Sequence, residues 1–181
     1  MIQAQTTVDA SEPPRPLTDS EKEHLAADTS VVPEFKQNCL ERDAQKNWDL
    51  FYKRNTTAFY KDRHWTSREF PELISGPLVL LEAGCGVGNF IFPLLEENPQ
   101  LFIYACDFSK RAVDFVKANE NYKDSRCSAF QCDITSSDLT DNIPSSSVDL
   151  CSLIFVLSAI HPDKMVQALQ NIHRVTNDEN I

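Results

Sequence analysis

The stretch Glu82-Ala-Gly84-Cys-Gly86-Val-Gly88 decides the fold, because it directly follows an apolar, strand-like run and precedes a helical segment. Its glycines let the chain turn tightly and let a ligand approach the backbone. The amide groups at the start of the next helix then face that ligand. The spacing G-x-G-x-G differs from the G-x-G-x-x-G of NAD-binding enzymes, and the G-K-[S/T] of nucleoside triphosphate loops is absent. The stretch therefore predicts a ligand-binding turn of another class.

Outward from this turn, apolar runs alternate with helical segments. We expect strands at residues 78–82, 101–106, 127–131 and 148–156, and helices at 89–97, 109–119 and 162–175. This alternation, with nearly continuous apolar strands, predicts an α/β fold in which helices cover both faces of a parallel sheet. Four strands are few for such a sheet, and the fourth would form an apolar edge.

The residues before the sheet have a different character. Residues 1–17 are polar and contain several prolines, which predicts a disordered tail. The stretch from Thr18 to Glu21 resembles a capping box that opens a helix to about residue 27. A second helix is expected over residues 33–54, followed by a loop. The chain thus divides into a tail (1–17), a helical segment (18–77) and a Rossmann-like domain (78–181).

Acidic residues follow the second and third expected strands. Asp107 stands at the tip of the second strand, where a carboxylate can accept both ribose hydroxyls of a nucleoside. Asp133 follows the third strand and suits an adenine amino group, with Ile134 beside the ring. Each has a local alternative, since Asp107 could cap the helix at Ser109 and Asp133 could belong to a turn. Together with the glycine turn, they predict a nucleoside-cofactor site.

Charge is unevenly distributed along the chain. The formal net charge is −10, yet residues 36–68 contain eight basic and four acidic side chains. This stretch also carries seven aromatic or histidine side chains, from Trp48 to Trp65. Interleaved basic and aromatic residues can stack on bases and contact phosphates. An amphipathic helix that packs its aromatic residues on a core explains the same composition, so both interpretations stand on composition alone.

The cysteines and the apolar runs indicate which metal sites, cellular compartment and membrane contacts to expect. None of the six cysteines forms a C-x-x-C pair or lies near histidine at zinc spacing, so we expect no metal. Reduced thiols indicate a cytoplasmic or nuclear protein. No apolar run reaches membrane-spanning length, so no membrane partner is expected.

Several segments resemble those of one known family, the eukaryotic methyltransferase-like enzymes that form 3-methylcytidine at position 32 in the tRNA anticodon loop. The resemblance covers residues 18–175, and its glycine motif is common to many methyltransferases. Two segments are more specific to this family, Trp48-Asp-Leu-Phe-Tyr52 and Lys61-Asp-Arg-His-Trp65. The resemblance implies a class I, Rossmann-like fold that depends on S-adenosylmethionine, with a helical N-terminal extension.

The family resemblance also implies roles for individual residues. The implied cofactor contacts are Trp48, Tyr52, Gly84, Gly86, Gly88, Asp107, Asp133, Ile134 and Ile154. The implied RNA contacts are Lys53, Arg54, Lys61, Arg63 and His64. In this family the helical segment 18–77 acts as a lid over the cofactor. Arg63 and His64 could either pack within this lid or contact RNA. No catalytic base is assigned, because N3 of cytosine already carries a lone pair. The N-terminal sequence is similar to that of the serine-tRNA branch of the family, which implies seryl-tRNA synthetase as a partner.

The chain departs from the family after its last helix. Family members continue into further strands, whereas this sequence ends with Thr176-Asn-Asp-Glu-Asn-Ile181. We therefore expect a C-terminally truncated domain that lacks three of the usual seven strands. Two alternatives follow for its function: a non-catalytic isoform or interaction fragment, and a small-molecule methyltransferase with the same cofactor features.

Overall fold

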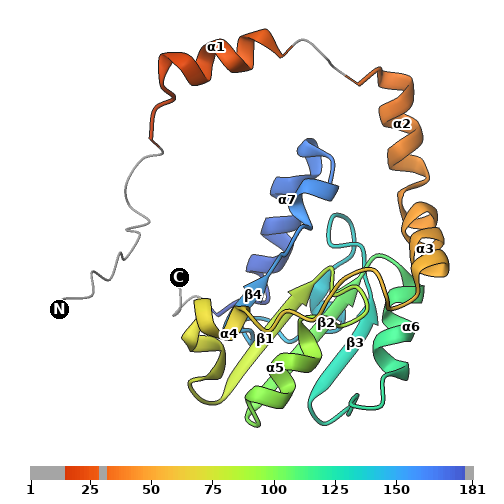
Figure 1. Cartoon of the computed structure of the whole chain (residues 1–181), viewed down its shortest axis with the longest axis vertical. Helices are drawn as coiled ribbons and strands as arrows, with labels where there is room; N and C mark the ends of the chain where they lie inside the picture. Colours follow the sequence, from red (N-terminus) through yellow and green to blue (C-terminus); the bar gives the residue numbers. More distant parts are fainter. Residues whose placement is uncertain (1–14, 29–31, 178–181) are drawn as a thin grey trace. The chain divides into compact units, whose positions relative to one another are not determined.

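A parallel four-stranded sheet forms the centre of the computed structural model, which describes residues 15–28 and 32–177. The strands are β1 (Leu78–Ala83), β2 (Leu101–Asp107), β3 (Cys127–Gln131) and β4 (Leu150–Ser152), in the order β3-β2-β1-β4 (Figure 1). In the register, Ala83 lies opposite Cys106, and Glu82 lies opposite Ser152. The parallel α/β architecture expected from the sequence is confirmed.

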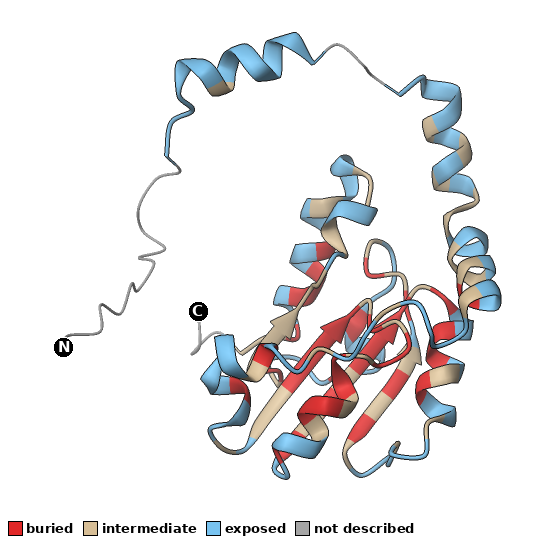
Figure 2. Ribbon diagram, in the orientation of Figure 1, coloured by how far each residue is buried: buried red, intermediate tan, exposed pale blue. Residues whose placement is uncertain are grey.

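Helices cover both faces of the sheet. The helices α5 (Ile91–Glu97) and α6 (Lys110–Ala118) pack on one face, where they share a core with Leu80, Ile103 and Ala129. The helix α7 (Pro162–His173) packs on the other face with Leu81 and Val148. Two 3-10 turns, η2 (Leu139–Asp141) and η3 (Leu157–Ala159), lie in the connections that flank β4. Figure 2 shows buried residues concentrated on the strands and on the helix faces turned toward them.

The fourth strand is shorter than expected: β4 covers three residues, whereas the apolar run predicted nine, from 148 to 156. The chain leaves the sheet beyond Ser152, and Phe155 adopts a left-handed backbone with φ 60°. The turn brings Val156 over the glycine turn after β1, so a Cβ atom at Gly84 would lie 2.4 Å from Val156 Cγ2. Contact with the glycine turn therefore overrides the strand propensity of this run.

The outer side of β4 has a neighbour near its start. The amides of Ser147 and Val148 both donate to the Val175 carbonyl at 2.9 Å, and the Asn177 amide donates to the Val148 carbonyl at 2.8 Å. Val148 and Thr176 form a parallel bridge. The residues after α7 therefore begin to pair with the edge of the sheet that the sequence analysis predicted to be exposed.

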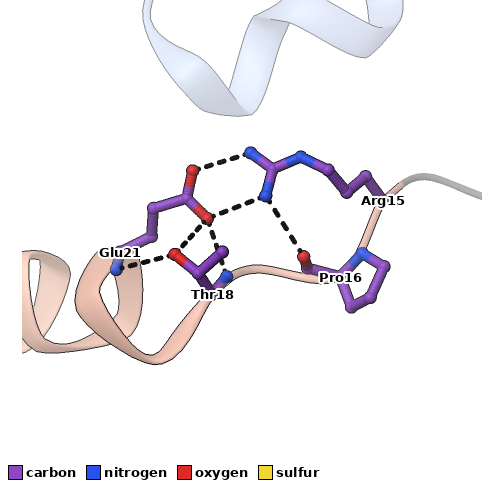
Figure 3. Close-up of polar contacts among 4 residues, drawn as sticks. All are labelled: Arg15, Pro16, Thr18 and Glu21. Atoms are coloured by element: carbon purple, nitrogen blue, oxygen red, sulfur yellow. Dashed lines mark hydrogen bonds and ion pairs between the residues drawn. The ribbon is translucent and has the colours of Figure 1, made fainter.

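The chain separates into two units, Met1–Asn38 and Cys39–Ile181. The first contains α1 (Asp19–Ala27), which begins with the expected capping box (Figure 3). Thr18 Oγ1 accepts from the Glu21 amide at 3.3 Å, and Glu21 Oε2 accepts from the Thr18 amide at 2.7 Å. The guanidinium of Arg15 bonds both Glu21 oxygens and, with the Thr18 donors, lowers the pKa of Glu21 to about 2. Of the tail expected at 1–17, residues 1–14 lie outside the described residues.

The single helix expected over residues 33–54 is two helices, α2 (Glu34–Arg42) and α3 (Ala44–Asn55). Asp43 separates them with φ −99° and ψ 6°, a conformation outside the helical region. Its carboxylate accepts from Arg42 at 2.8 Å and caps no helix amide. A local ion pair thus accompanies the break in a pattern that is otherwise continuous.

The loop expected at 55–77 contains two short helical turns, α4 (Thr66–Glu69) and the 3-10 turn η1 (Pro71–Ile74). Thr66 and Leu73 are buried, and Thr66 Oγ1 donates to the Arg63 carbonyl at 2.9 Å. Each turn has four residues, too few to show a sequence periodicity, so neither was predicted from the sequence.

Candidate cofactor site

A cavity of about 240 Å³ opens at the carboxyl ends of the strands. Open parallel sheets bind ligands at this edge. Eight of the nine residues expected to contact a cofactor line the cavity: Trp48, Tyr52, Gly84, Gly86, Asp107, Asp133, Ile134 and Ile154. The structure therefore brings together side chains from α3, from the glycine turn and from the ends of three strands.

Gly88 is the ninth residue of that set, and it does not line the cavity. Its φ is 93°, and a Cβ atom there would lie 2.4 Å from the ring of Phe92. The third glycine of the motif is therefore explained by close packing of the turn against α5. The first glycine, Gly84, fixes the other end of the turn, where its amide and that of Cys85 both donate to the Cys106 carbonyl.

Asp107 joins two turns at the floor of the cavity. Its Oδ2 accepts from the Gly86 amide and its Oδ1 from the Ser109 amide, both at 2.8 Å. Burial raises the pKa of Asp107 to about 6, while these two amides act in the opposite direction. Ser109 itself caps α6, since its Oγ accepts from the Ala112 amide at 3.3 Å. A carboxylate has about four acceptor positions, so Asp107 can hold both turns and still accept from a ligand.

Asp133 is held in a local turn at the end of β3. Its Oδ1 accepts from the amide and hydroxyl of Thr135 at 2.9 and 2.7 Å, and its Oδ2 accepts from the Ser136 hydroxyl at 2.9 Å. The turn that we considered as an alternative role is therefore present. Asp133 and the neighbouring, buried Ile134 nevertheless line the cavity.

The helix α3 forms one wall of the cavity. Trp48 and Tyr52 lie one turn apart with stacked rings at a centroid distance of 6.2 Å, and burial raises the pKa of Tyr52. The helix is held to the start of α6 by Asp49, which accepts from the Ser109 hydroxyl and from the Arg111 amide. A carboxylate at a helix N-terminus is favoured by the helix dipole. Asp49 was not singled out from the sequence, because its partners lie about 60 positions away.

The residues expected to contact RNA do not form one cluster around the cavity. Lys53, Arg54, Lys61 and His64 are exposed, whereas Arg63 lines the cavity. The Arg63 guanidinium lies 5.5 Å from the ring of Phe155 and 6.0 Å from that of Tyr60. Asn89 holds this loop in place: its side chain donates to the Tyr60 carbonyl at 3.1 Å and its carbonyl accepts from the Arg63 amide at 2.8 Å.

Three further cavity residues were not assigned a role from the sequence. Glu82, the acidic residue of the glycine motif, is only 4% exposed, and burial raises its pKa well above the ordinary value. Glu41 and Lys164 form an ion pair between the end of α2 and the start of α7. Glu41 and Lys164 are 123 positions apart in the sequence, so no local pattern links them. His161 also lines the cavity and caps α7, because its Nδ1 accepts from the Asp163 amide at 3.3 Å.

Residues 15–28 and 32–177 contain no cluster of three or more His, Cys, Asp or Glu side chains suited to a metal ion. No helix in these ranges has the length and hydropathy needed to cross a bilayer.

The glycine turn, Asp107 and the strand-tip cavity agree with a comparison to known families. A methyltransferase domain model matches residues 81–181. The chain belongs to the methyltransferase domain family. This methyltransferase domain is 60% identical over 167 residues to the human tRNA N(3)-cytidine methyltransferase METTL6, and the match covers 89% of the chain and 59% of the relative. It is 45% identical to the tRNA N(3)-methylcytidine methyltransferase trm141 of Schizosaccharomyces pombe, across 81% of the chain and 60% of the relative.

The methyltransferase domain thus spans about three fifths of the length of these curated relatives. Among solved structures, it resembles a phosphoethanolamine N-methyltransferase from Haemonchus contortus in complex with phosphoethanolamine and S-adenosylhomocysteine. The TM-score is 0.55 at 19% identity, over 75% of this chain and 30% of the other. The likeness confirms the Rossmann-like methyltransferase fold, and the sequence matches confirm the family resemblance.

Proposed function

We propose that this domain binds S-adenosylmethionine and belongs to an enzyme that methylates N3 of cytidine in tRNA. The observation that supports this most is the shared cavity of Asp107, the glycine turn and α3, in a chain 60% identical to a tRNA N(3)-cytidine methyltransferase. The cofactor would supply an electrophilic methyl group on sulfur. The residues of the chain would bind and align it.

The cavity residues suit the parts of such a cofactor. Asp107 offers acceptor positions for the ribose hydroxyls, in addition to those used by Gly86 and Ser109. Ile134 provides an apolar contact for a purine ring, since it is buried beside Asp133. Trp48 and Tyr52 enclose the opposite side from α3. Asp107 and Ile134 are both buried, and a polar contact in such a setting is stronger than in water.

Methyl transfer to cytosine N3 requires alignment more than proton transfer. The attacking lone pair is present at neutral pH, so the chain needs no general base before the new N–C bond forms and the C–S bond breaks. Holding the base and the methyl group about 3 Å apart in line supplies the rate enhancement. N3 lies on the Watson–Crick edge, so the base must be unstacked and unpaired. A target base would enter beside Phe155, Ala159 and His161, which line the cavity after β4.

We extend the proposal to the substrate and its setting. The target is a cytidine in the anticodon loop, in serine tRNA, with seryl-tRNA synthetase as partner; the resemblance of the segments at 48–52 and 61–65 supports this choice. The exposed Lys53, Arg54, Lys61 and His64 would contact the RNA backbone. A cytoplasmic or nuclear location is supported by six free cysteines, four of them buried.

Titration calorimetry of S-adenosylmethionine into the 181-residue chain tests the first part, with circular dichroism to verify folding. We expect micromolar binding, and Asp107→Ala should reduce the affinity at least tenfold. A folded chain that binds no cofactor would support the non-catalytic interaction fragment instead. If the cofactor binds, methylation of serine tRNA is compared with that of small amines, and transfer to small amines alone would indicate a small-molecule methyltransferase.

A further inference from the structure

Two buried cysteines stand immediately before the two acidic residues at the strand ends of the cavity. Cys106 precedes Asp107 at the end of β2, and Cys132 precedes Asp133 just after β3. These two strands are neighbours in the sheet (Figure 1). Neither thiol is needed for the proposed methyl transfer, yet each lies one residue away from a carboxylate of the cavity.

The strand register brings the two cysteine side chains to the same face of the sheet. Cys106 lies opposite Phe130, and side chains alternate along a strand, so Cys132 shares the face of Phe130. The Cys132 amide donates to the Asp107 carbonyl at 3.0 Å, which continues the pairing beyond the end of β3. Cys106 and Cys132 also belong to one buried cluster, on the face that α7 covers. The two thiols are therefore neighbours at the cavity end of β2 and β3.

Cys132 is the member of this pair that a small solute can reach. Its side chain lines the cavity, whereas Cys106 is fully buried and does not line it. A hydrogen bond from the Cys106 thiol, together with one from Ser137, lowers the pKa of Cys132 against the effect of burial. The thiolate is the reactive form of cysteine. The thiol that faces the cavity is therefore also the better nucleophile of the two.

Three other cysteines in and beside the sheet lack this combination. Cys85 lines the cavity, but burial raises its pKa well above the ordinary value, and its thiol donates to the Gly86 carbonyl at 3.7 Å. Burial raises the pKa of Cys127 and that of Cys151 to about 12, and neither residue lines the cavity. Cys127 lies in the other core cluster, on the face that α5 and α6 cover. These cysteines provide internal references for the reactivity of Cys132.

We propose that Cys106 and Cys132 form a dithiol that hydrogen peroxide converts into a disulfide. The Cys132 thiolate attacks one peroxide oxygen, the O–O bond breaks, and the leaving hydroxide takes a proton to become water. The Cys106 sulfur then attacks the sulfur of the resulting sulfenic acid. The S–S bond forms, and the sulfenic hydroxyl leaves with the Cys106 proton as a second water. Two electrons thus pass from the two thiols to the peroxide.

The disulfide would alter the spacing of the two acidic strand ends. Bonded sulfur atoms lie closer together than two thiols in contact, so the ends of β2 and β3 must be drawn together. Asp107 and Asp133 directly follow the linked residues and must move with them. We therefore expect the oxidised chain to bind the cofactor more weakly. This consequence rests on the proposed function, whereas the reactivity of the dithiol does not. Disulfides of cytosolic proteins commonly serve such transient, redox-sensing roles.

Peptide mapping by mass spectrometry tests the dithiol in the 181-residue chain. The reduced chain is exposed to hydrogen peroxide, the remaining thiols are alkylated, and the linked residues are identified by fragmentation. We expect a disulfide between Cys106 and Cys132 to form before Cys127 or Cys151 is oxidised, and dithiothreitol should reverse it. In Cys106→Ala, the sulfenic acid on Cys132 should persist and be trapped by dimedone. Cys127→Ala is the matched control, and it should form the disulfide at the wild-type rate.

Calorimetry of the reduced and oxidised chains measures the consequence for the cavity. We expect oxidation to weaken binding of S-adenosylmethionine by at least about fivefold in wild type and in Cys127→Ala. The affinity of Cys132→Ala should be the same before and after exposure to peroxide. An excess of S-adenosylmethionine should also slow formation of the disulfide, because Cys132 lines the cavity that the cofactor would fill.

The outcomes separate this inference from the proposed function. If the reduced wild-type chain binds no S-adenosylmethionine, cofactor binding is wrong, and the peptide map still decides whether the dithiol reacts. If peroxide links other cysteines, or oxidises Cys127 as readily as Cys132, the dithiol is overturned. A disulfide between Cys106 and Cys132 that leaves the affinity unchanged would overturn its effect on the cavity. Circular dichroism verifies folding of each variant, and the map of the wild-type chain requires no variant.

Discussion

The two halves of the cavity are held by different kinds of contact. The strand-tip half, with Gly84, Gly86 and Asp107, is fixed by backbone hydrogen bonds between neighbouring turns. The lid half, formed by α3 and the loop at 60–63, is held mainly by side-chain contacts, from the apolar face of α3 and from Asp49, Asn89 and Glu41, with one backbone bond from Arg63 to Asn89. The strand-tip half therefore forms with the sheet itself, whereas the lid half can be loosened without unfolding the sheet. This difference predicts how substitutions in each half divide between stability and binding.

The largest effect should follow Gly84→Ala in the strand-tip half. The new Cβ atom would lie 2.4 Å from Val156 Cγ2, and alanine must adopt φ 74°. Strain and overpacking together should lower the free energy of unfolding by about 2–5 kcal/mol in urea denaturation. The double variant with Val156→Ala should recover the steric part. An unchanged midpoint for Gly84→Ala would contradict the tight contact between the turn and the β4 connection.

The second effect is a pH dependence that belongs to Asp107. Its pKa in the folded chain is about 6, above the ordinary 3.8, so the folded state binds this proton more tightly than the unfolded state. Wild type should therefore lose about 2 kcal/mol of stability relative to Asp107→Asn as pH rises from about 4 to 6.5. Denaturation of both proteins across this range measures the difference. A constant difference between them would mean that burial does not perturb Asp107.

A smaller effect on stability, confined to the lid half, is expected for Asp49→Ala. The change removes the acceptor for the Ser109 hydroxyl and for the Arg111 amide. Loss of two hydrogen bonds should cost about 1–2 kcal/mol, and hydrogen exchange in α3 should rise while the strands stay protected. Asp49→Asn, which keeps one oxygen acceptor, is the matched control. Equal loss of protection in α3 and in β1 would show that lid and sheet unfold together.

The smallest effect should come from the ion pair between Glu41 and Lys164. Both side chains are partly exposed, at 33% and 50%, so their coupling should be only about 0.5 kcal/mol and should fall with salt. A double-mutant cycle with Glu41→Gln and Lys164→Met measures it at two ionic strengths. A coupling above about 2 kcal/mol would make the lid half as firmly held as the strand tips.

The same division explains what could be predicted from the sequence. The glycine turn and Asp107 follow from short motifs, because their partners lie on adjacent strands with regular spacing. The lid contacts of Asp49 and Lys164 join positions 60 and 123 residues apart, which no local pattern reveals. Two predictions were wrong, the single helix over residues 33–54 and the long strand over residues 148–156. The backbone of Asp43 leaves the helical conformation, and the approach of Val156 to Gly84 ends β4 early, where the sequence pattern predicts one continuous helix and one long strand.

The bidentate role of Asp107 makes two distant amides report on a single event. The amides of Gly86 and Ser109 share one carboxylate, so a hydroxyl donor that draws electron density from it would weaken both bonds at once. In a nuclear magnetic resonance titration, the two amide resonances should shift along a common path at the same ligand concentration. Occupancy of the cavity could then be followed from the backbone alone, without any label on the ligand.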